Sequence, residues 1–143
     1  MKTANFNILK KHEIKNAVSI ALFPSNFTEV KFEYKALAPN FKLFNDLKKK
    51  KITEEKFIKN YKEQLSELNP KNVLEHLMLL TGNEEPILMC HCAKTKFCHR
   101  HLVADWLEET LNVAIKEYNK PNHIRKNGYL LKRKEPSLFE DDD

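Results

Sequence analysis

The sequence predicts an α/β protein: a single compact domain with a mostly parallel sheet flanked by helices, in Rossmann-like layers. Short apolar runs that are typical of strands alternate with longer segments whose apolar residues repeat at helical spacing. One run, residues 87–92, is apolar on both faces, as is typical of parallel strands covered by helices. A chain of 143 residues can bury a substantial core, so residues 1–143 are predicted to form one domain.

The first predicted elements lie before residue 52. Residues 17–23 form an apolar run that predicts a buried strand, ended by Pro24. Residues 30–37 are mixed and predict at most a short strand. Residues 41–50 predict a short helix, and the four lysines at positions 48–51 suit the negative end of its dipole.

Two further helices are predicted by their capping residues. Thr53 can cap the first, and two glutamates suit its first turn. The apolar residues of this helix repeat at helical spacing: Ile58, Tyr61, Leu65 and Leu68. Asn69 as cap and Pro70 at the first helical position begin the second, which Gly82 can end. Its predicted buried stripe is Val73, Leu74, Leu77 and Leu80.

The last predicted elements follow the strand at residues 87–92. Residues 98–112 predict a helix. Its buried stripe is Leu102, Val103, Trp106, Leu107 and Leu111. Residues 113–115 can open a further strand, and Asn127-Gly128 predicts a hairpin turn.

The overall charge and the cysteine count indicate partners and a compartment. A net charge of +5 weakly favours an anionic small molecule or nucleic acid, although most lysines are expected on solvated faces. No apolar run has the length of a membrane span, and the N-terminus predicts no signal peptide. Three cysteines cannot all pair within one chain, so reduced thiols in the cytoplasm are expected.

All three cysteines lie within nine residues, as Cys90, Cys92 and Cys98. Cys92 ends the predicted strand and Cys98 begins the predicted helix. Ligands of open α/β sheets bind outside the carboxyl ends of the strands. The strand-to-helix loop is therefore the candidate site.

Cations surround the same loop and predict an anion pocket. Lys94, Lys96 and Arg100 lie near the helix start, where unpaired amide groups and the helix dipole also favour an anion. These charges are expected to lower the pKa of a nearby thiol.

Helical geometry separates the residues around the helix start. His99 precedes Val103 by four positions and lies on the inward stripe, flanked by Arg100. Cys98, His99 and Arg100 are therefore expected to converge on one pocket. His101 lies roughly opposite and is expected in solvent, and Cys90 is expected to pack in the core as a small hydrophobic residue.

One interpretation of the cluster is a thiol-dependent enzyme. Cys98 or Cys92 is then the nucleophile, and His99 is a base or an orienting partner. Arg100 and the helix amides hold an anion. A phosphatase-type loop is disfavoured, because Cys98 stands where that loop has its terminal arginine after Cys92.

A second interpretation is a zinc site, since three cysteines and a histidine supply the right ligand types. Cys-x-Cys on a buried strand is not the usual zinc knuckle, and no second pair stands at finger spacing. The sequence therefore predicts no metal and no cofactor. In the third interpretation the cluster is structural: His99 donates to a carbonyl, and Arg100 pairs with an acid such as Asp105 or with a chain terminus. A non-enzymatic nucleic-acid-binding accessory protein fits that case.

Two segments resemble the domain-of-unknown-function 488 (DUF488) family of bacterial and phage proteins. They are LMCHC at residues 88–92 and CHRHLVA at residues 98–104. The segment LAP at residues 37–39, followed by residues 41–47 and 52–61, is similar to the proline-bearing segment and the following helix of the family.

The resemblance covers roughly residues 15–112 and leaves a C-terminal extension at about 119–143 without a match. It implies a compact α/β fold, with Cys98, His99 and Arg100 as signature positions after a preceding cysteine pair. No N-terminal strand motif with Asp-x-Arg is found.

The resulting hypothesis is a cytoplasmic thiol-dependent enzyme, or a binder of an anionic, nucleotide-like ligand, at the Cys/His/Arg loop. The alternative is a non-enzymatic nucleic-acid-binding accessory protein. The sequence leaves open whether the chain is an enzyme, and it leaves the oligomeric state open.

Overall fold

The computed structural model describes residues 1–27, 30–92 and 96–132. In this part of the chain, five strands form one parallel sheet in the order β3-β2-β4-β1-β5. They are β1 (Lys2–Asn5), β2 (Ala17–Ser19), β3 (Phe32–Glu33), β4 (Ile87–Cys90) and β5 (Lys116–Glu117). The helices are α1 (Phe41–Lys48), α2 (Glu54–Ser66), α3 (Pro70–Leu80) and α4 (His99–Leu111), with 3-10 helices η1 (Phe6–Lys10) and η2 (Lys35–Leu37). The α/β prediction is confirmed.

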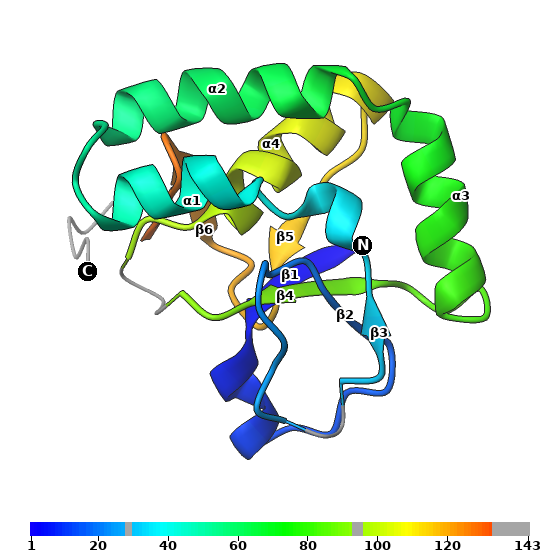
Figure 1. The fold of residues 1–143 in the computed structure, drawn as a ribbon. Coiled ribbons are helices and arrows are strands. Elements are labelled where there is room, and N and C mark those ends of the chain that lie inside the picture. Colours follow the sequence, from blue (N-terminus) through cyan, green and yellow to red (C-terminus); the bar gives the residue numbers. More distant parts are fainter. Residues whose placement is uncertain (28–29, 93–95, 133–143) are drawn as a thin grey trace, which may run out of the picture.

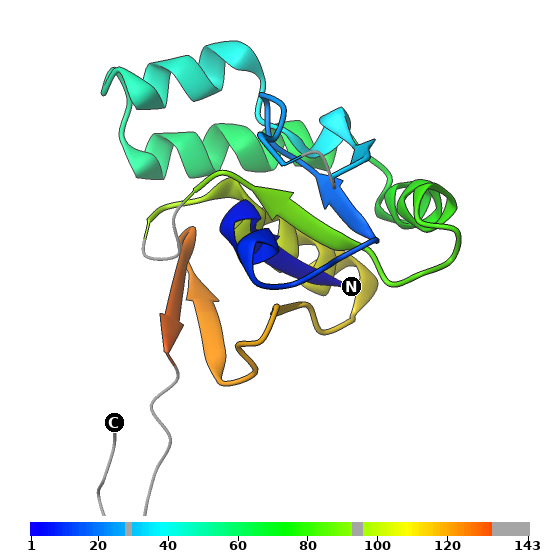
Figure 2. The same cartoon turned by 90° about the horizontal axis from the view of Figure 1, so that it is seen from below.

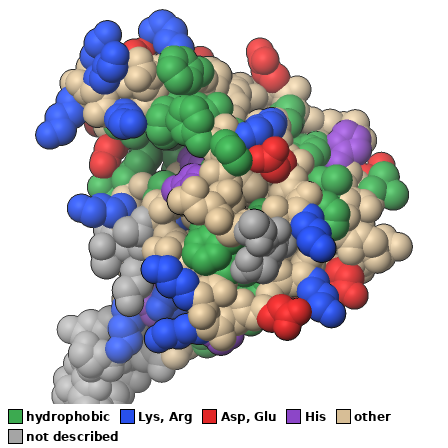
Figure 3. Space-filling view, turned by 60° about the horizontal axis from the view of Figure 1, so that its bottom comes forward, with side chains coloured by type: hydrophobic (Ala, Val, Ile, Leu, Met, Phe, Trp, Pro, Cys, Tyr) green, Lys and Arg blue, Asp and Glu red, His purple; other side chains and the backbone are tan. Residues whose placement is uncertain are grey.

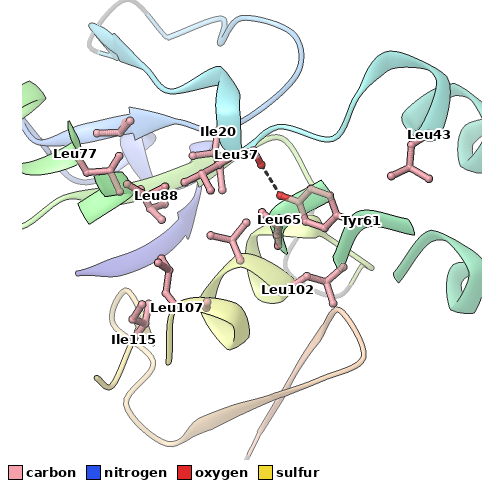
Figure 4. Packing of buried hydrophobic residues seen from close by; sticks show 14 of the residues in the cluster. Ile20, Leu37, Leu43, Tyr61, Leu65, Leu77, Leu88, Leu102, Leu107 and Ile115 are labelled. Carbon is pink, nitrogen blue, oxygen red and sulfur yellow. Dashed lines mark hydrogen bonds between the residues drawn. The ribbon is translucent and has the colours of Figure 1, made fainter. Parts of the chain in front are cut away.

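The sheet separates two apolar layers. Helices α1, α2 and α4 lie on one side of it, and η1 lies on the other (Figure 1). On the helical side, the strand residues Val18 and Leu88 are fully buried together with Leu65, Leu77 and Leu107 (Figure 4). On the other side, a second cluster is made by Ala4, Ala17, Met89, Phe6 and Leu9. Each face is therefore covered, as a parallel sheet requires.

A buried hydroxyl fixes α2 against the segment after β3. Tyr61 is fully buried in α2, and its hydroxyl donates to the carbonyl of Leu37 (Figure 4). A buried polar group needs such a partner, so this bond sets the depth at which the helix packs.

The register brings several strand ends to one edge of the sheet. Asn5 at the end of β1 pairs with Cys90 at the end of β4, and Ser19 at the end of β2 pairs with Met89. The chain leaves β4 at this edge, and Cys98 is the N-cap of α4. The candidate loop therefore lies at the carboxyl edge, where ligands of open α/β sheets bind.

The helix starts agree with the predictions, because their caps are local. The Thr53 hydroxyl accepts from the amide of Lys56, and the Asn69 side chain accepts from the amide of Asn72, both at 3.1 Å. Gly82 follows α3 in the left-handed region, at φ +64°.

The strands differ more from the predictions than the helices do. The run at residues 17–23 is a strand only over Ala17–Ser19, and the run at 30–37 only over Phe32–Glu33. The strand expected from residues 113–115 begins later, at Lys116. Strand β1 was not predicted, because its sequence KTAN is polar, yet it lies between β4 and β5.

No helix in the described ranges is long and apolar enough to cross a membrane.

The predicted turn at Asn127-Gly128 is confirmed. It joins β6 (His123–Lys126) and β7 (Tyr129–Lys132), an antiparallel hairpin at the opposite end of the molecule from α3 (Figure 2). The carbonyl of Gly128 accepts the amide of Cys98 at 2.9 Å, so the hairpin is attached to the start of α4.

Substituting Gly128 by alanine is expected to destabilise the fold by about 1–3 kcal/mol. Gly128 has φ +84°, and an added Cβ would lie 2.3 Å from the Phe97 ring. Gly82→Ala is the matched control, since it imposes the same left-handed strain at φ +64° with nothing within 4 Å of the new Cβ. Urea unfolding of both variants should show the larger loss at Gly128, and equal losses would contradict a close approach of Phe97.

Candidate functional site

Four side chains meet where β4 ends and α4 begins. The possible ligand atoms of Cys90, Cys92, Cys98 and His99 all lie within 4.8 Å of one another. Cys90 ends β4 and Cys92 follows it, whereas Cys98 caps α4 and His99 is its first residue. This Cys/His cluster includes Cys90, which is buried as expected but also belongs to the site.

The four residues differ in their access to solvent. Cys90 is fully buried, Cys98 is 1% exposed and His99 is 8% exposed, whereas Cys92 is only half-buried. Cys92 is therefore the sulfur that a molecule from solvent reaches most easily. The side chain of Asn5 donates to the carbonyl of Cys92 and holds the chain just beyond the strand end.

Arg100 lies behind the cluster and not at its mouth. Its guanidinium is completely buried, with Nε and Nη2 donating to Glu117 at 3.2 and 2.9 Å. Its Nη1 lies 3.3 Å from Cys90 Sγ and 3.2 Å from the Cys92 carbonyl. The acid that pairs with Arg100 is Glu117. It is not Asp105, the acid named as an example for a structural cluster. The guanidinium is thus positioned to stabilise negative charge on Cys90.

A second arginine reaches the same carboxylate. Arg125 on β6 places Nη2 3.8 Å from Glu117, and its side chain is 6% exposed. Two buried guanidiniums therefore share one carboxylate within this network. The surplus positive charge lies next to Cys90 Sγ, where a thiolate compensates it.

The pKa shifts of the three thiols follow the same arrangement. Cys90 has a pKa well below its usual range, because hydrogen bonds from the other two thiols and the charge of Arg100 outweigh its burial. The hydrogen bond to Cys90 raises the pKa of Cys92 to about 12. Burial, together with the bond to Cys90, raises the pKa of Cys98 well above its usual range. The thiol whose pKa is lowered near the helix start is therefore Cys90, and not Cys98.

His99 is held as a neutral ring. Its Nε2 lies 2.7 Å from the carbonyl oxygen of Ile20, and burial lowers its pKa. A neutral imidazole that donates from Nε2 keeps the lone pair of Nδ1. The ring also packs edge-on against Tyr61, at 5.9 Å between centroids.

The expectation that His101 lies in solvent is wrong. His101 is fully buried, and its Nδ1 accepts from Arg125 Nε at 3.2 Å. The reason is tertiary: β1 and β6 pack against α4 on the side that an isolated helix would leave open. Burial, followed by the charges of Arg100 and Arg125, lowers the pKa of His101 to about 3.

The predicted lysines contribute little to the described site. Lys94 lies outside the described residues, and Lys96 is exposed. Among the described residues, Lys48 at the end of α1 is a cation that lines the approach to the cluster.

An aromatic cavity leads to the cluster. Its volume is about 180 Å³, and it is lined by Pro39, Phe44, Leu47, Lys48, Phe57, Cys92, Phe97, Cys98 and His99. Phe57 and Phe97 meet edge-to-face at 5.4 Å between centroids. Figure 3 shows hydrophobic side chains gathered on one face, with Lys and Arg side chains above them at the upper left. No pattern in the sequence indicates these walls, because they come from α1, α2 and the loop before α4.

The fold and the cluster define an α/β protein with a thiol-rich centre at the carboxyl edge of a parallel sheet. The chain belongs to the DUF488 family: the family model described as the active DUF488-N3 subclade (DUF488-N3a) matches residues 7–111. This match includes the four cluster residues and confirms the family resemblance. No curated protein and no solved structure matches the chain.

Proposed function

We propose that the chain is a thiol-dependent enzyme that acts on an anionic, nucleotide-like molecule, with Cys92 as its nucleophile. The aromatic cavity that ends on Cys92, Cys98 and His99 carries this proposal. Of the two thiols that line the cavity, Cys92 is half-buried and Cys98 is buried. The description of the matched subclade as active also favours a working site.

The charges behind the cavity stabilise a thiolate on Cys90, next to this nucleophile. The excess positive charge of Arg100 and Arg125 over Glu117 favours a negative sulfur on Cys90. As Cys92 attacks an electrophilic centre, its S–H bond breaks and the proton passes to the leaving group. A bond forms between the Cys92 sulfur and the substrate, and the leaving group departs with its electron pair. His99 is a positioning residue here: the bond between its Nε2 and the Ile20 carbonyl fixes the ring beside Cys92 and Cys98.

The cavity walls indicate the ligand class. Phe44, Phe57 and Phe97 offer apolar faces to a planar ring, and Lys48 adds a cation at the same cavity. The lysines at positions 48–51 continue this positive charge along the surface. A ring joined to a phosphate fits both features.

Iodoacetamide labelling of the chelator-treated protein at neutral pH is expected to modify Cys92 first. Cys90 and Cys98 should be labelled only after unfolding, because they are buried. Peptide mass mapping identifies the labelled site, and a nucleoside monophosphate should slow the reaction. Phe44→Ala should remove this protection without changing the order of labelling. Equal labelling of the three thiols, or no protection by any nucleotide, would count against the proposal.

A second candidate function is a non-enzymatic nucleic-acid-binding accessory protein. The exposed lysines at positions 48–51 favour it. Salt-sensitive binding of an oligonucleotide that survives Cys92→Ser but weakens on replacing these lysines would support this candidate. No binding at low salt would exclude it.

A further inference from the structure

We propose that Cys90, Cys92, Cys98 and His99 form a binding site for a single zinc ion. This goes beyond the proposed function, because it assigns the same sulfurs a second, metal-bound state. Cys92 is then free for chemistry only when the ion has left or a ligand has displaced Cys92 from it.

The first support is the distance among the four ligand atoms. They lie within 4.8 Å of one another. With Zn–S and Zn–N bonds of about 2.3 and 2.0 Å, a tetrahedral site places neighbouring ligand atoms roughly 3.5–3.8 Å apart. Small side-chain rotations therefore suffice to close the cluster around an ion. The sequence predicts no metal, because it lacks a second pair of cysteines or histidines at finger spacing. In the fold, however, the end of the strand and the start of the helix together supply all four ligands.

The second support is the orientation of His99. Histidines that bind metals usually donate their other ring N–H to a carboxylate or a backbone carbonyl. His99 Nε2 lies 2.7 Å from the Ile20 carbonyl oxygen, which leaves Nδ1 as the nitrogen for an ion. The ring is thus held in advance, with no rearrangement of α4.

The third support is the balance of buried charge. A zinc ion with three thiolates and a neutral imidazole carries one negative charge. The network of Arg100, Arg125 and Glu117 carries one positive charge, and Arg100 Nη1 lies 3.3 Å from Cys90 Sγ. The two charges cancel inside the protein, where an uncompensated charge is costly. Thiolate ligands also favour zinc over magnesium or calcium.

The cavity gives the ion a route from solvent. Cys92, Cys98 and His99 line it, and Cys92 is the most exposed of the four ligands. Cys92 is therefore the ligand that an incoming molecule displaces first. Zinc at this position protects the thiols and blocks alkylation of Cys92.

Cobalt titration of the reduced full-length chain, stripped of metal under anaerobic conditions, tests the site. One Co²⁺ per chain is expected, with the charge-transfer and visible bands of a tetrahedral thiolate site, and one equivalent of Zn²⁺ should remove these bands. Elemental analysis of protein purified without chelator should find one zinc per chain. Cys98→Ser and His99→Gln should each weaken binding on the order of a hundredfold or more. His76→Gln, at an exposed histidine outside the cluster, should not.

Circular dichroism and the change in Tm with zinc separate a loss of metal binding from a loss of folding. Circular dichroism establishes that each stripped variant is folded, and zinc should raise the Tm of the parent chain but not that of a folded Cys98→Ser variant. A folded parent chain that takes up no cobalt, or binds it without thiolate bands, overturns the metal site. Fast labelling of Cys92 with nucleotide protection but no metal uptake would leave the enzyme proposal standing alone. Metal uptake without nucleotide protection would leave only the metal site.

Discussion

Replacing Glu117 by glutamine is expected to lower the free energy of unfolding by about 3–5 kcal/mol. The carboxylate is 5% exposed and accepts from Arg100 and from the hydroxyl of Thr3, with Arg125 3.8 Å away. Glutamine keeps the size of the side chain but removes its charge. Two buried guanidiniums then lose their shared anion, and urea unfolding followed by circular dichroism measures the loss.

The matched control is Glu85→Gln, which makes the same chemical change at the surface. Glu85 also pairs with two cations, Lys2 and the N-terminal amine, but it is 46% exposed. Solvent screens this pairing, so the expected loss is at most about 1 kcal/mol. Similar losses for the two variants would show that burial of the Glu117 network contributes nothing extra.

A double variant separates the lost ion pair from the unpaired charge. Glu117→Gln together with Arg125→Gln removes one anion and one cation and leaves Arg100 beside Cys90. Part of the stability lost in the single variant should return. A double variant that is less stable by the sum of both single losses would contradict this charge balance.

Helices were predicted well because their signals are local. Thr53 and Asn69 each cap a helix through a side chain bonded to an amide three residues away. The inward stripe of α2 was predicted less fully, since Phe57 is buried and Ile58 only half-buried. Which residues flank a stripe depends on the neighbouring layer, and a single sequence does not contain that layer.

Strand β1 shows why the sheet was only partly predicted. Thr3 is fully buried and yet polar, because its hydroxyl donates to Glu117, a residue 114 positions away. Hydrophobic periodicity cannot register a strand whose polar side chain is satisfied by so distant a partner. His101 was misplaced for the same reason, since the hairpin that covers it follows in the sequence.

The cysteines and the histidine predicted at the strand-to-helix loop lie together in the structure, but their charges are distributed differently. Residues two positions apart in a strand lie on one face, so the spacing of Cys90 and Cys92 is a signal that Cys90 belongs with the cluster. The expectation that Cys90 packs in the core as a small hydrophobic residue does not take this spacing into account. The partner that gives Cys90 its charge is Arg100, which Glu117 on β5 holds in place, and that contact depends on the fold.

Lowering the pH from 6.5 to 5 is expected to destabilise the fold through His101. Its pKa is about 3 in the folded chain against an ordinary value of 6.5, because it is buried between Arg100 and Arg125. In this range the unfolded chain binds a proton at His101 that the folded chain does not. The free energy of unfolding therefore falls by up to about 1.4 kcal/mol per pH unit from this residue. The contribution of His101 to the free energy of unfolding is complete above pH 6.5 and is lost progressively toward pH 3.

Urea unfolding of the metal-free chain at several pH values, compared with His101→Asn, isolates this contribution. The asparagine carbonyl can accept from Arg125 as Nδ1 does, but it takes up no proton. The pKa of His99 and that of His123 are also lowered, so their contributions have the same sign and remain in the variant. The variant should therefore lose less stability than the parent between pH 6.5 and 5. If the free energy of unfolding falls equally with pH in the parent and in the variant, His101 has the same pKa in the folded and the unfolded chain. That result would contradict its burial between two guanidiniums.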